Sequence, residues 1–546
     1  MSDSVEQQLW DATQRILDSQ SQKKLVIAGP GTGKTFLFRK LLETCPGSHD
    51  DRLVLTFINN LKDDLERSLG ELASVYTLHA YCQRLLYRHA QLRDGLTSQF
   101  RCYPGLASLI KQDWQWLEGS QAPEFIKKMR DLECPDEQAG FYVRRANYYD
   151  AVDFDDSVYR TYCQLRDQPE SIPDYELVLV DEFQDFNAME AGIIDLLASR
   201  SSIVIAGDDD QALYSQLRGA NWNYIRAHHQ SGDFEVFELP FSMRCPKVVV
   251  GAVNDIIDRA RAESRLDGRV DKPYRYFEPL KGEVSRLYPN IELVRTSVQR
   301  LNANYFGRYI EHAIRNISEA DIEEATQNLE PLALVIGPKP YLPQIERHLV
   351  DAGLLLPANE QKTSLWDDGL SILSSDPESN LGWRLILACE EEEFAAECIQ
   401  AANERGTPLL LVIPEEQRDA VLQEAAEMEA SQAVEEEALD EAGGASSIKL
   451  TSYEGSKGLS SQHVFVAGLH SGDLPRDPDD IRDIEICRFL VGLTRTKKKC
   501  TLLLTRRFGQ DLKNPSSFLE WIDESRYDVV NVDAAYWKRL AQSGPN

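Results

Sequence analysis

The most regular feature of the sequence is a recurring short run of apolar residues that ends in Gly, Ser or an acidic residue. Apolarity in these runs is continuous rather than alternating, which is typical of strands buried on both faces in parallel sheets. The runs are KKLVIAG at 23–29, DRLVLTF at 51–57, YELVLVDE at 175–182, SSIVIAGD at 201–208, PLALVIG at 331–337, PLLLVIP at 408–414, HVFVAGL at 463–469 and KCTLLLT at 499–505. Segments with helical periodicity, such as FLFRKLLETC and AMEAGIIDLLAS, lie between them. The pattern predicts an α/β protein, and the clustering of the runs predicts two sheets.

The length of 546 residues exceeds what one hydrophobic core usually serves, so two large domains are expected. One stretch with helical periodicity interrupts the first group of strands, and a second stretch, ending in an acidic Ala/Glu-rich segment closed by AGGASS, interrupts the second group. We therefore predict a first domain at 1–90 and 146–240 with a helical insertion at 91–145, and a second domain at 241–354 and 448–546 with an insertion at 355–447.

The charge balance of the chain argues against simple nucleic-acid binding. Asp and Glu total 89 against 59 Lys and Arg, a formal charge of −30, whereas phosphate neutralisation by cations supplies most non-specific affinity. Binding depends on the local footprint, however, and much of the acid is confined to CEEEEF at 389–394 and to 415–441. Basic clusters stand elsewhere, in KKMR, RR at 144–145 and TRTKKK. The charge weakens an expectation of DNA binding without removing it.

The 10 cysteines form no CxxC pair and show no zinc-type spacing with His, so we expect buried thiols in a reducing compartment and no metal bound by them. The start MSDSVEQQLW has no signal-peptide pattern, and no apolar stretch approaches membrane-spanning length. These features predict a soluble, cytoplasmic protein without a membrane partner.

A phosphate-binding loop is the strongest motif. AGPGTGKT follows the run LVI and precedes a helical segment. Its glycines let backbone N–H groups wrap a phosphate at a helix N-terminus, Lys34 reaches the terminal phosphates, and Thr35 ligates Mg²⁺. The octet predicts ATP contacts throughout, and Arg39 on the following helix is a further candidate. Its residues are Ala28, Gly29, Pro30, Gly31, Thr32, Gly33, Lys34 and Thr35.

A pair of carboxylates follows another predicted strand, in LVLVDEFQD. A parallel strand ending here would deliver them beside the phosphate loop. Asp181 suits a second ligand of Mg²⁺, and Glu182 suits the base that orients water for attack on the γ-phosphate. The two motifs together predict an ATPase whose cofactors are ATP and Mg²⁺.

The order of motifs along the chain closely resembles that of superfamily 1 DNA helicases of the UvrD/Rep type. The series is AGPGTGKT, VDEFQD, IAGDDDQALYSQLRGA, MRCP, YEGSKGL and VGLTRT. The resemblance runs from about Gln14 to about Arg507 and implies two RecA-like P-loop domains with helical insertions, the second of them reduced. Gln211 then resembles the sensor of the γ-phosphate, and Arg244 and Arg495 resemble two arginines that the second domain presents to the transition state. Gln14, with Gln8 as an alternative, stands where the family has its adenine-reading glutamine.

The same resemblance implies contacts to single-stranded DNA. LTFINN, YTLHAY, DFDD and ALYSQ contain the candidates, and Lys457 of YEGSKGL is added to them. Aromatic rings in such positions stack on bases without regard to sequence, with about 1–3 kcal/mol per base, although core packing is the alternative for Phe57 and Phe154. The candidate residues are Phe57, Asn59, Thr77, His79, Phe154, Tyr214 and Lys457.

The chain departs from the family pattern at several DNA and base contacts. Met243 replaces an aromatic residue before Arg244, and Gln216 and Leu217 alter the usual aromatic-RGA arrangement. Glu454 and Ser460 stand where the family tends to have histidine and glutamate. Hydrolysis is expected to be intact, whereas the grip on DNA is modified.

Three functions remain open from the sequence. The first is an ATP-dependent 3′-to-5′ single-stranded DNA translocase and helicase acting on single-stranded or tailed duplex DNA; its polarity follows from the resemblance alone. The second is a motor subunit of a multi-protein DNA repair or anti-phage defence complex that powers or gates a partner nuclease. A separate nuclease is expected because the segment after the last motif is too short for such a domain. The third is an RNA-directed ATPase.

Overall fold

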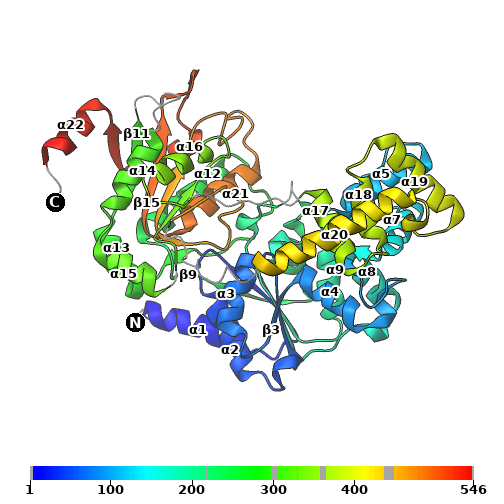
Figure 1. The fold of residues 1–546 in the computed structure, drawn as a ribbon. Helices are drawn as coiled ribbons and strands as arrows, with labels where there is room; N and C mark the ends of the chain where they lie inside the picture. Colours follow the sequence, from blue (N-terminus) through cyan, green and yellow to red (C-terminus); the bar gives the residue numbers. More distant parts are fainter. Residues whose placement is uncertain are drawn as a thin grey trace.

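Two six-stranded sheets and one helical body make up the molecule (Figure 1). The computed structural model describes residues 4–214, 218–296, 305–328, 330–356, 364–435 and 448–543. Every strand pairing within the two large sheets is parallel. This confirms the predicted α/β class, with an arrangement consistent with two RecA-like domains.

The first sheet has the strand order β3-β2-β6-β7-β1-β8. Leu25 and Ile27 of β1 face one helical layer, whereas Val26 and Ala28 face the other, so both faces are buried as the continuous apolar runs require. The strands are β1 Lys23–Ala28, β2 Arg52–Thr56, β3 Ser74–Thr77, β6 Leu177–Val180, β7 Ile203–Gly207 and β8 Glu235–Leu239. One face carries α1 Val5–Asp18, α2 Lys34–Thr44 and α3 Asn59–Leu69; the other carries α4 Leu78–Arg88, α8 Phe154–Asp167, α9 Ala188–Leu197 and α11 Asn223–Ser231.

The second sheet has the order β13-β12-β14-β15-β11-β18 and is covered in the same way. Its strands are β11 Ile291–Thr296, β12 Ala333–Ile336, β13 Ile448–Thr451, β14 Ser461–Ala467, β15 Thr496–Thr505 and β18 Tyr527–Val532. Helices α12 Lys247–Ala262 and α21 Asp483–Thr494 pack on one face, and α14 Tyr305–Arg315 and α16 Leu342–Asp351 pack on the other. Further elements are β9 Phe241–Ser242, β10 Arg275–Tyr276, α13 Glu278–Leu287, α15 Glu319–Gln327, β16 Arg507–Phe508, β17 Asp511–Leu512 and α22 Ala534–Ser543.

The two insertions form one helical body. Figure 1 shows helices from the cyan and yellow parts of the chain packed together beside the first sheet. Their apolar side chains belong to a single buried cluster that includes Leu109, Tyr142, Trp383 and Leu385. The first insertion supplies α5 Leu106–Glu118, α6 Phe125–Arg130 and α7 Asp136–Tyr149, and the second supplies α17 Leu365–Ser375, α18 Asn380–Leu387, α19 Glu392–Arg405 and α20 Glu415–Glu435. A short pairing of β4 Arg101–Cys102 with β5 Ala151–Val152 lies at the start and end of the first insertion.

One predicted strand is wrong. The run PLLLVIP at 408–414 forms a short 3-10 turn, Leu409–Leu411, and Leu409 and Ile413 are buried in the core of the helical body. A short apolar run fits a buried strand and a partly buried helical turn equally well, and here Leu411 of the run is 60% exposed.

Among the described residues, no helix combines the length and apolar character needed to cross a membrane.

Candidate nucleotide site between the two sheets

The phosphate loop lies between β1 and α2, and its glycines allow another segment to approach it. Gly31 and Gly33 have φ of 70° and 90°, in the region that favours glycine. A Cβ on Gly31 would lie 2.4 Å from the Cβ of Arg244. The backbone N–H of Met243 donates to the carbonyl of Gly31 at 2.8 Å. The segment that carries Arg244 is therefore attached to the phosphate loop through its backbone.

Lys34 and the two carboxylates that follow β6 form one buried ion cluster. The Lys34 Nζ lies 2.5 Å from Glu182 Oε1 and 3.4 Å from Asp181 Oδ1. Glu182 has a φ of 56°, a conformation that non-glycine residues rarely adopt and that is often found at functional sites. Burial alone would raise the pKa of Glu182, but Lys34 and Lys457 hold this pKa well below its usual value. The carboxylate of Glu182 is therefore ionised and ready to accept a hydrogen bond.

The second sheet contributes charged groups to the opposite side of this cluster. Arg495, at the end of α21, is buried and donates to Gln211 Oε1 at 3.0 Å. Arg244 donates to the carbonyl of Thr494 at 3.3 Å. Burial, with the positive charge of Arg244 nearby, lowers the pKa of Arg495. Two guanidinium groups this close would be stabilised by a polyanion.

These groups surround one cavity of about 350 Å³. Both sheets line it, because it lies where the carboxyl ends of the first sheet's strands meet the second sheet. Its lining includes Pro30, Gly31, Thr32, Gly33, Lys34, Thr35, Asp181, Glu182, Gln211, Met243, Arg244, Gly458, Ser460, Arg495 and Lys497. Thr35 and Asp181 are among them, and a hydroxyl with a carboxylate is the oxygen set that suits Mg²⁺ beside phosphates. The lining residues therefore fit a nucleotide with its metal ion.

Four candidates for ATP binding do not line this cavity: Ala28 and Gly29, at the start of the octet, and Gln14 and Arg39, which lie on helices. Gln14, on α1, donates through Nε2 to Asp18 Oδ1 at 2.7 Å. Arg39, on α2, is 48% exposed at its side chain and pairs with Glu43 at 3.3 Å. Neither residue lines the cavity, so neither contacts the groups that would hold the phosphates in this arrangement.

The candidates for DNA binding form a cluster on the first domain. Phe57 is only 4% exposed, and its ring centroid lies 5.1 Å from that of Tyr214. The guanidinium of Arg218 lies over the Phe57 ring, 4.8 Å from its centroid, and one of its nitrogens lies 2.8 Å from His79 Nε2. Burial and the charge of Arg218 lower the pKa of His79 to about 3, so this histidine is neutral near pH 7. Phe154 is 46% exposed, with its ring 6.1 Å from His79.

The remaining DNA candidates have structural partners. Thr77 accepts a hydrogen bond from the backbone N–H of Ala80 at 3.2 Å and so caps α4. Lys457 is buried between the sheets, where it pairs with Asp185 and donates to the carbonyl of Gln211 at 2.7 Å. The side chain of Asn59, together with Gln216 and Leu217, lies outside the described part of the chain.

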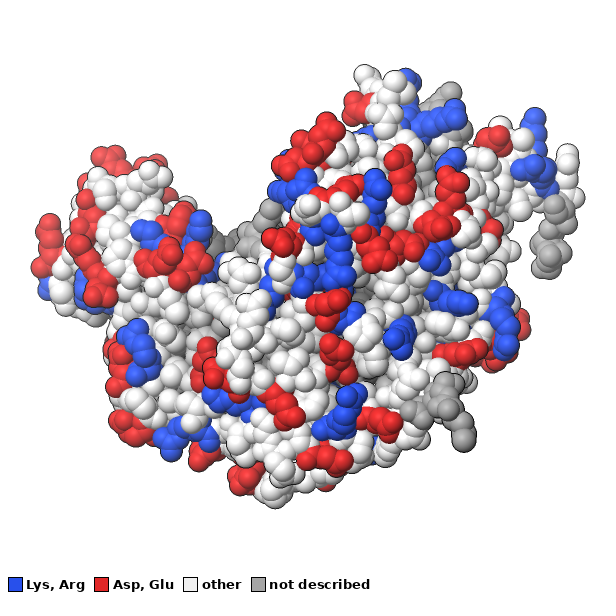
Figure 2. All heavy atoms as spheres, turned by 180° about the vertical axis from the view of Figure 1, so that it is seen from behind, with Lys and Arg blue, Asp and Glu red and all other residues white. Residues whose placement is uncertain are grey.

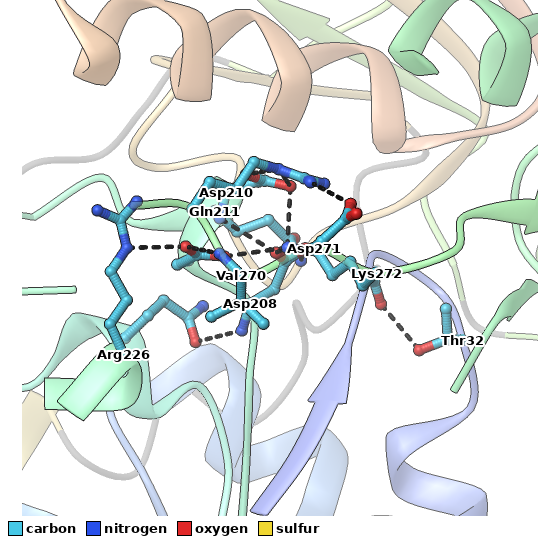
Figure 3. Close-up of polar contacts among 12 residues, drawn as sticks. Thr32, Asp208, Asp210, Gln211, Arg226, Val270, Asp271 and Lys272 are labelled. Atoms are coloured by element: carbon cyan, nitrogen blue, oxygen red, sulfur yellow. Dashed lines mark hydrogen bonds and ion pairs between the residues drawn. The ribbon is translucent and has the colours of Figure 1, made fainter. Parts of the chain in front are cut away.

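A charged cluster behind the cavity was missed by the sequence reasoning. Asp208, Asp209 and Asp210 all contact Lys272, and two arginines complete the cluster (Figure 3). These are Arg269, which contacts Asp210, and Arg226, which contacts Asp209. Three adjacent acidic residues at the end of a buried strand were a signal that cations must lie nearby.

Comparisons with known proteins agree with the motif order. The AAA domain family matches residues 13–216. The ATP-dependent DNA helicase PcrA of Staphylococcus epidermidis is 26% identical over 279 residues, which cover 43% of this chain and 37% of that relative. PcrA of Staphylococcus aureus is 26% identical over 275 residues, again covering 43% of this chain and 37% of the relative. These matches confirm the resemblance to superfamily 1 helicases of the UvrD/Rep type, while the aligned part spans well under half of the curated relatives' length.

Proposed function

We propose that this chain, as a relative of the UvrD/Rep-type superfamily 1 helicases, is an ATP hydrolase that moves along single-stranded DNA. The observation that supports the proposal best is the composition of the 350 Å³ cavity. Its first-domain wall carries Lys34 and Glu182, and its second-domain wall carries Arg495. Hydrolysis groups divided between two domains make the distance between those domains depend on the nucleotide.

The chain's own residues supply the chemistry of hydrolysis. ATP with Mg²⁺ would bring the transferable γ-phosphate and the cation that neutralises it. Lys34, now paired with Glu182 at 2.5 Å, is the cation that would turn to the terminal phosphates. Glu182, kept ionised by its neighbours, would then orient the attacking water, and Thr35 and Asp181 would hold the metal ion.

The positions of the two arginines would depend differently on closure of the two domains. Arg244 is held to the phosphate loop through the hydrogen bond of Met243 to Gly31, and it also donates to the carbonyl of Thr494 at the end of α21, so it bridges the two domains. Arg495 arrives on α21, which packs in the core of the second sheet. Arg495 is therefore the group whose approach requires the two sheets to close, and its bond to Gln211 links that closure to the first domain.

The same Gln211 region continues to the proposed DNA site. Tyr214 lies three positions further on, contacts Phe57, and donates through its hydroxyl to the carbonyl of Glu454 of the second domain at 2.9 Å. A change in the relation of the two domains would therefore move an aromatic group beside Phe57. Stacking of bases at this point, with a 3′-to-5′ direction of movement, is the family property that we propose for this chain.

The test is ATP turnover with matched DNA and RNA strands. We expect DNA to stimulate turnover about tenfold or more and RNA to stimulate it less, and Lys34→Ala to abolish turnover because its ammonium is lost. Lys40→Ala is the matched control, since Lys40 lies on the same helix and pairs with Glu43 at the surface. Normal turnover by Lys34→Ala would exclude this site, and equal stimulation by RNA would exclude the DNA assignment.

Duplexes with a single-stranded 3′ or 5′ tail test movement and its direction. A 3′-to-5′ motor unwinds the duplex with the 3′ tail and leaves the one with the 5′ tail intact. Stimulated turnover with no unwinding of either substrate would support the second function below.

The second candidate is a motor subunit that powers or gates a partner nuclease, for instance in DNA repair or anti-phage defence. The observation that favours it is the charge: the chain carries −30, and the face in Figure 2 has acidic and basic side chains interspersed. An excess of negative charge, without a continuous basic surface on this face, weakens the independent hold on DNA that long-range movement needs. Co-purification with a nuclease, together with turnover that rises only when that partner is added, would support this candidate; strong unwinding by the isolated chain would oppose it.

A further inference from the structure

The charged cluster behind the cavity is balanced and almost fully buried. Lys272 Nζ lies 2.6 Å from Asp208 Oδ1, 3.0 Å from Asp209 Oδ1 and 2.9 Å from Asp210 Oδ2. Arg269 pairs with Asp210 and Arg226 pairs with Asp209, so that the three aspartates face three cations. Arg269 also lies 3.5 Å from the exposed Asp271. Figure 3 shows the lysine entering the acidic group from a separate segment. The mechanism proposed above assigns no role to Lys272.

The place between the three aspartates resembles a cation site, since their oxygens lie within 4.8 Å of one another. A divalent cation would use such oxygens. Here the ammonium of Lys272 already contacts all three, so the chain supplies its own cation. The cluster is therefore a fixed charged support and not a second metal site.

Asp208 connects this support to the hydrolytic groups. Its Oδ1 contacts Lys272, and its Oδ2 accepts from Gln211 Nε2 at 2.9 Å. The amide oxygen of Gln211 thereby points away from Asp208 and toward Arg495, from which it accepts a hydrogen bond at 3.0 Å. With its nitrogen bound to a carboxylate, the Gln211 amide cannot rotate by half a turn without bringing its own oxygen against that carboxylate.

A second connection leaves the same residue. The backbone N–H of Asp208 donates to Gln184 Oε1 at 2.9 Å. The other end of that amide, Gln184 Nε2, donates to Glu182 Oε2 at 2.5 Å. The position of Asp208 thus bears on both the proposed base and the arginine that faces it.

Lys272 lies where the chain crosses between the two domains. Leu266, after α12, is buried in the core of the second sheet, whereas Val270 is buried in the core of the first. Two residues beyond Lys272, the hydroxyl of Tyr274 donates to the carbonyl of Pro30 in the phosphate loop at 3.1 Å. The segment that carries Lys272 therefore spans the domain boundary next to the nucleotide cavity.

We propose that Lys272 is a positioning residue for ATP hydrolysis, which holds Asp208 so that Gln211 keeps its amide oxygen directed at Arg495. Lys272 does not line the nucleotide cavity, so it acts through Asp208 and Gln211 rather than on the phosphates. The inference rests on the proposed ATP hydrolysis and adds to it a residue outside every motif of the family series.

Lys272→Met tests the proposal. We expect kcat to fall about ten- to a hundredfold because the catalytic groups lose their alignment, whereas the Kd for ATP, measured by competition with a fluorescent nucleotide, changes by less than about threefold. Lys272→Arg should recover part of kcat because it restores the charge. An unchanged kcat, or a loss confined to ATP affinity, would overturn the proposal.

A double-mutant cycle separates positioning from general loss of structure. If Lys272 acts through Gln211, the double variant Lys272→Met with Gln211→Ala should turn over ATP no more slowly than Gln211→Ala alone. Multiplied losses would show that Lys272 acts by another route. Arg261→Met is the matched control, since it removes an exposed ion pair with Asp271 of the same segment, and its kcat should stay at the wild-type value.

Two further measurements cover a failure to fold and a failure of the proposed function. The double variant Lys272→Met with Asp208→Asn restores the charge balance, so it should regain the wild-type melting temperature. Its kcat should stay low, because a neutral amide at position 208 holds Gln211 less firmly. A wild-type kcat would overturn the proposal.

Amide hydrogen exchange needs no turnover. Residues 207–214 should exchange faster in Lys272→Met, while β14 and β15 should not, and equal exchange would contradict the proposal even if the wild-type chain hydrolysed no ATP.

Discussion

Two interfaces within this molecule join the same two halves of the chain, and they are built in opposite ways. Between the sheets, the contacts around the nucleotide cavity are polar: Lys457 with Asp185, and Arg495 with Gln211. Between the two insertions, the contact is a continuous apolar core in which Trp383 is fully buried. Polar contacts can be exchanged for contacts to a ligand, whereas separating a shared core exposes its whole apolar area to water.

The interface between the two insertions, called the insertion joint below, also contains buried charge. Separating the insertions would therefore disrupt buried ion pairs as well as the apolar core. Asp113 accepts from Arg384 of the second insertion at 2.9 Å and from Arg145 of the first at 2.9 Å. All three side chains are buried. Removing Asp113 from this group would leave two uncompensated positive charges in the interior. By packing, the second insertion therefore forms one body with the first insertion, although the chain reaches it from the second domain.

The largest expected effect lies in the cleft between the sheets. Glu182→Gln should lower kcat about 10²- to 10⁴-fold, because an amide cannot act as the base, while ATP still binds. Turnover and nucleotide affinity measured on the same preparation test this. Glu66→Gln, at the surface of α3, is the control and should change neither quantity. A variant that kept wild-type turnover would show that this cleft is not the hydrolytic site.

The next effect lies in the insertion joint. Arg384→Ala should destabilise the helical body by about 2–5 kcal/mol, because a large, fully buried side chain leaves a cavity. Asp113 loses one donor but keeps Arg145 and the hydroxyl of Tyr149. Denaturant unfolding followed by tryptophan fluorescence measures the loss. Arg405→Ala, exposed at the end of α19, is the control. Turnover without DNA should survive Arg384→Ala, and its loss would mean that the two interfaces are not independent.

A change of pH should have a smaller effect on stability, and it should act on the interface between the sheets. Burial raises the pKa of Asp185 in the cleft to about 6, despite the opposing charge of Lys457. The folded state therefore binds a proton at pH values where the unfolded state has lost it, so this group's contribution to stability falls as pH rises from about 4 to 6 and is constant above. As pH rises across that range, the free energy of unfolding of the wild-type chain should fall by about 1–3 kcal/mol relative to that of Asp185→Asn.

Melting temperatures of both chains at pH 4.5, 5.5, 7 and 8 test this prediction. The difference between them should change only below pH 7, which makes the two upper values an internal control. A difference that is constant from pH 4.5 upward would show that Asp185 is ionised throughout that range and that Lys457 outweighs its burial.

The two interfaces also mark what a sequence can predict. The cavity groups Lys34, Glu182 and Arg495 stand in short motifs, where local spacing carries the chemistry, and the structure brings them around one cavity. The joint could not be predicted, because the pairing of Asp113 with Arg384 joins positions 271 residues apart and no local pattern encodes it. Lys272 was missed for the same reason, since it stands outside the motif series.

The smallest effect is expected from locking the joint. Arg101 of the first insertion donates to Ser375 Oγ of the second at 3.0 Å, so cysteines at both positions lie within reach of a short bismaleimide. If the insertions form one body, the linked chain should keep DNA-stimulated turnover within about twofold, because no relative movement is being prevented. Each single-cysteine variant treated with the same reagent controls for modification of the ten native thiols. A large loss on linking would mean that the insertions separate during the cycle, and the contrast between a polar interface that opens and an apolar one that stays closed would then be wrong.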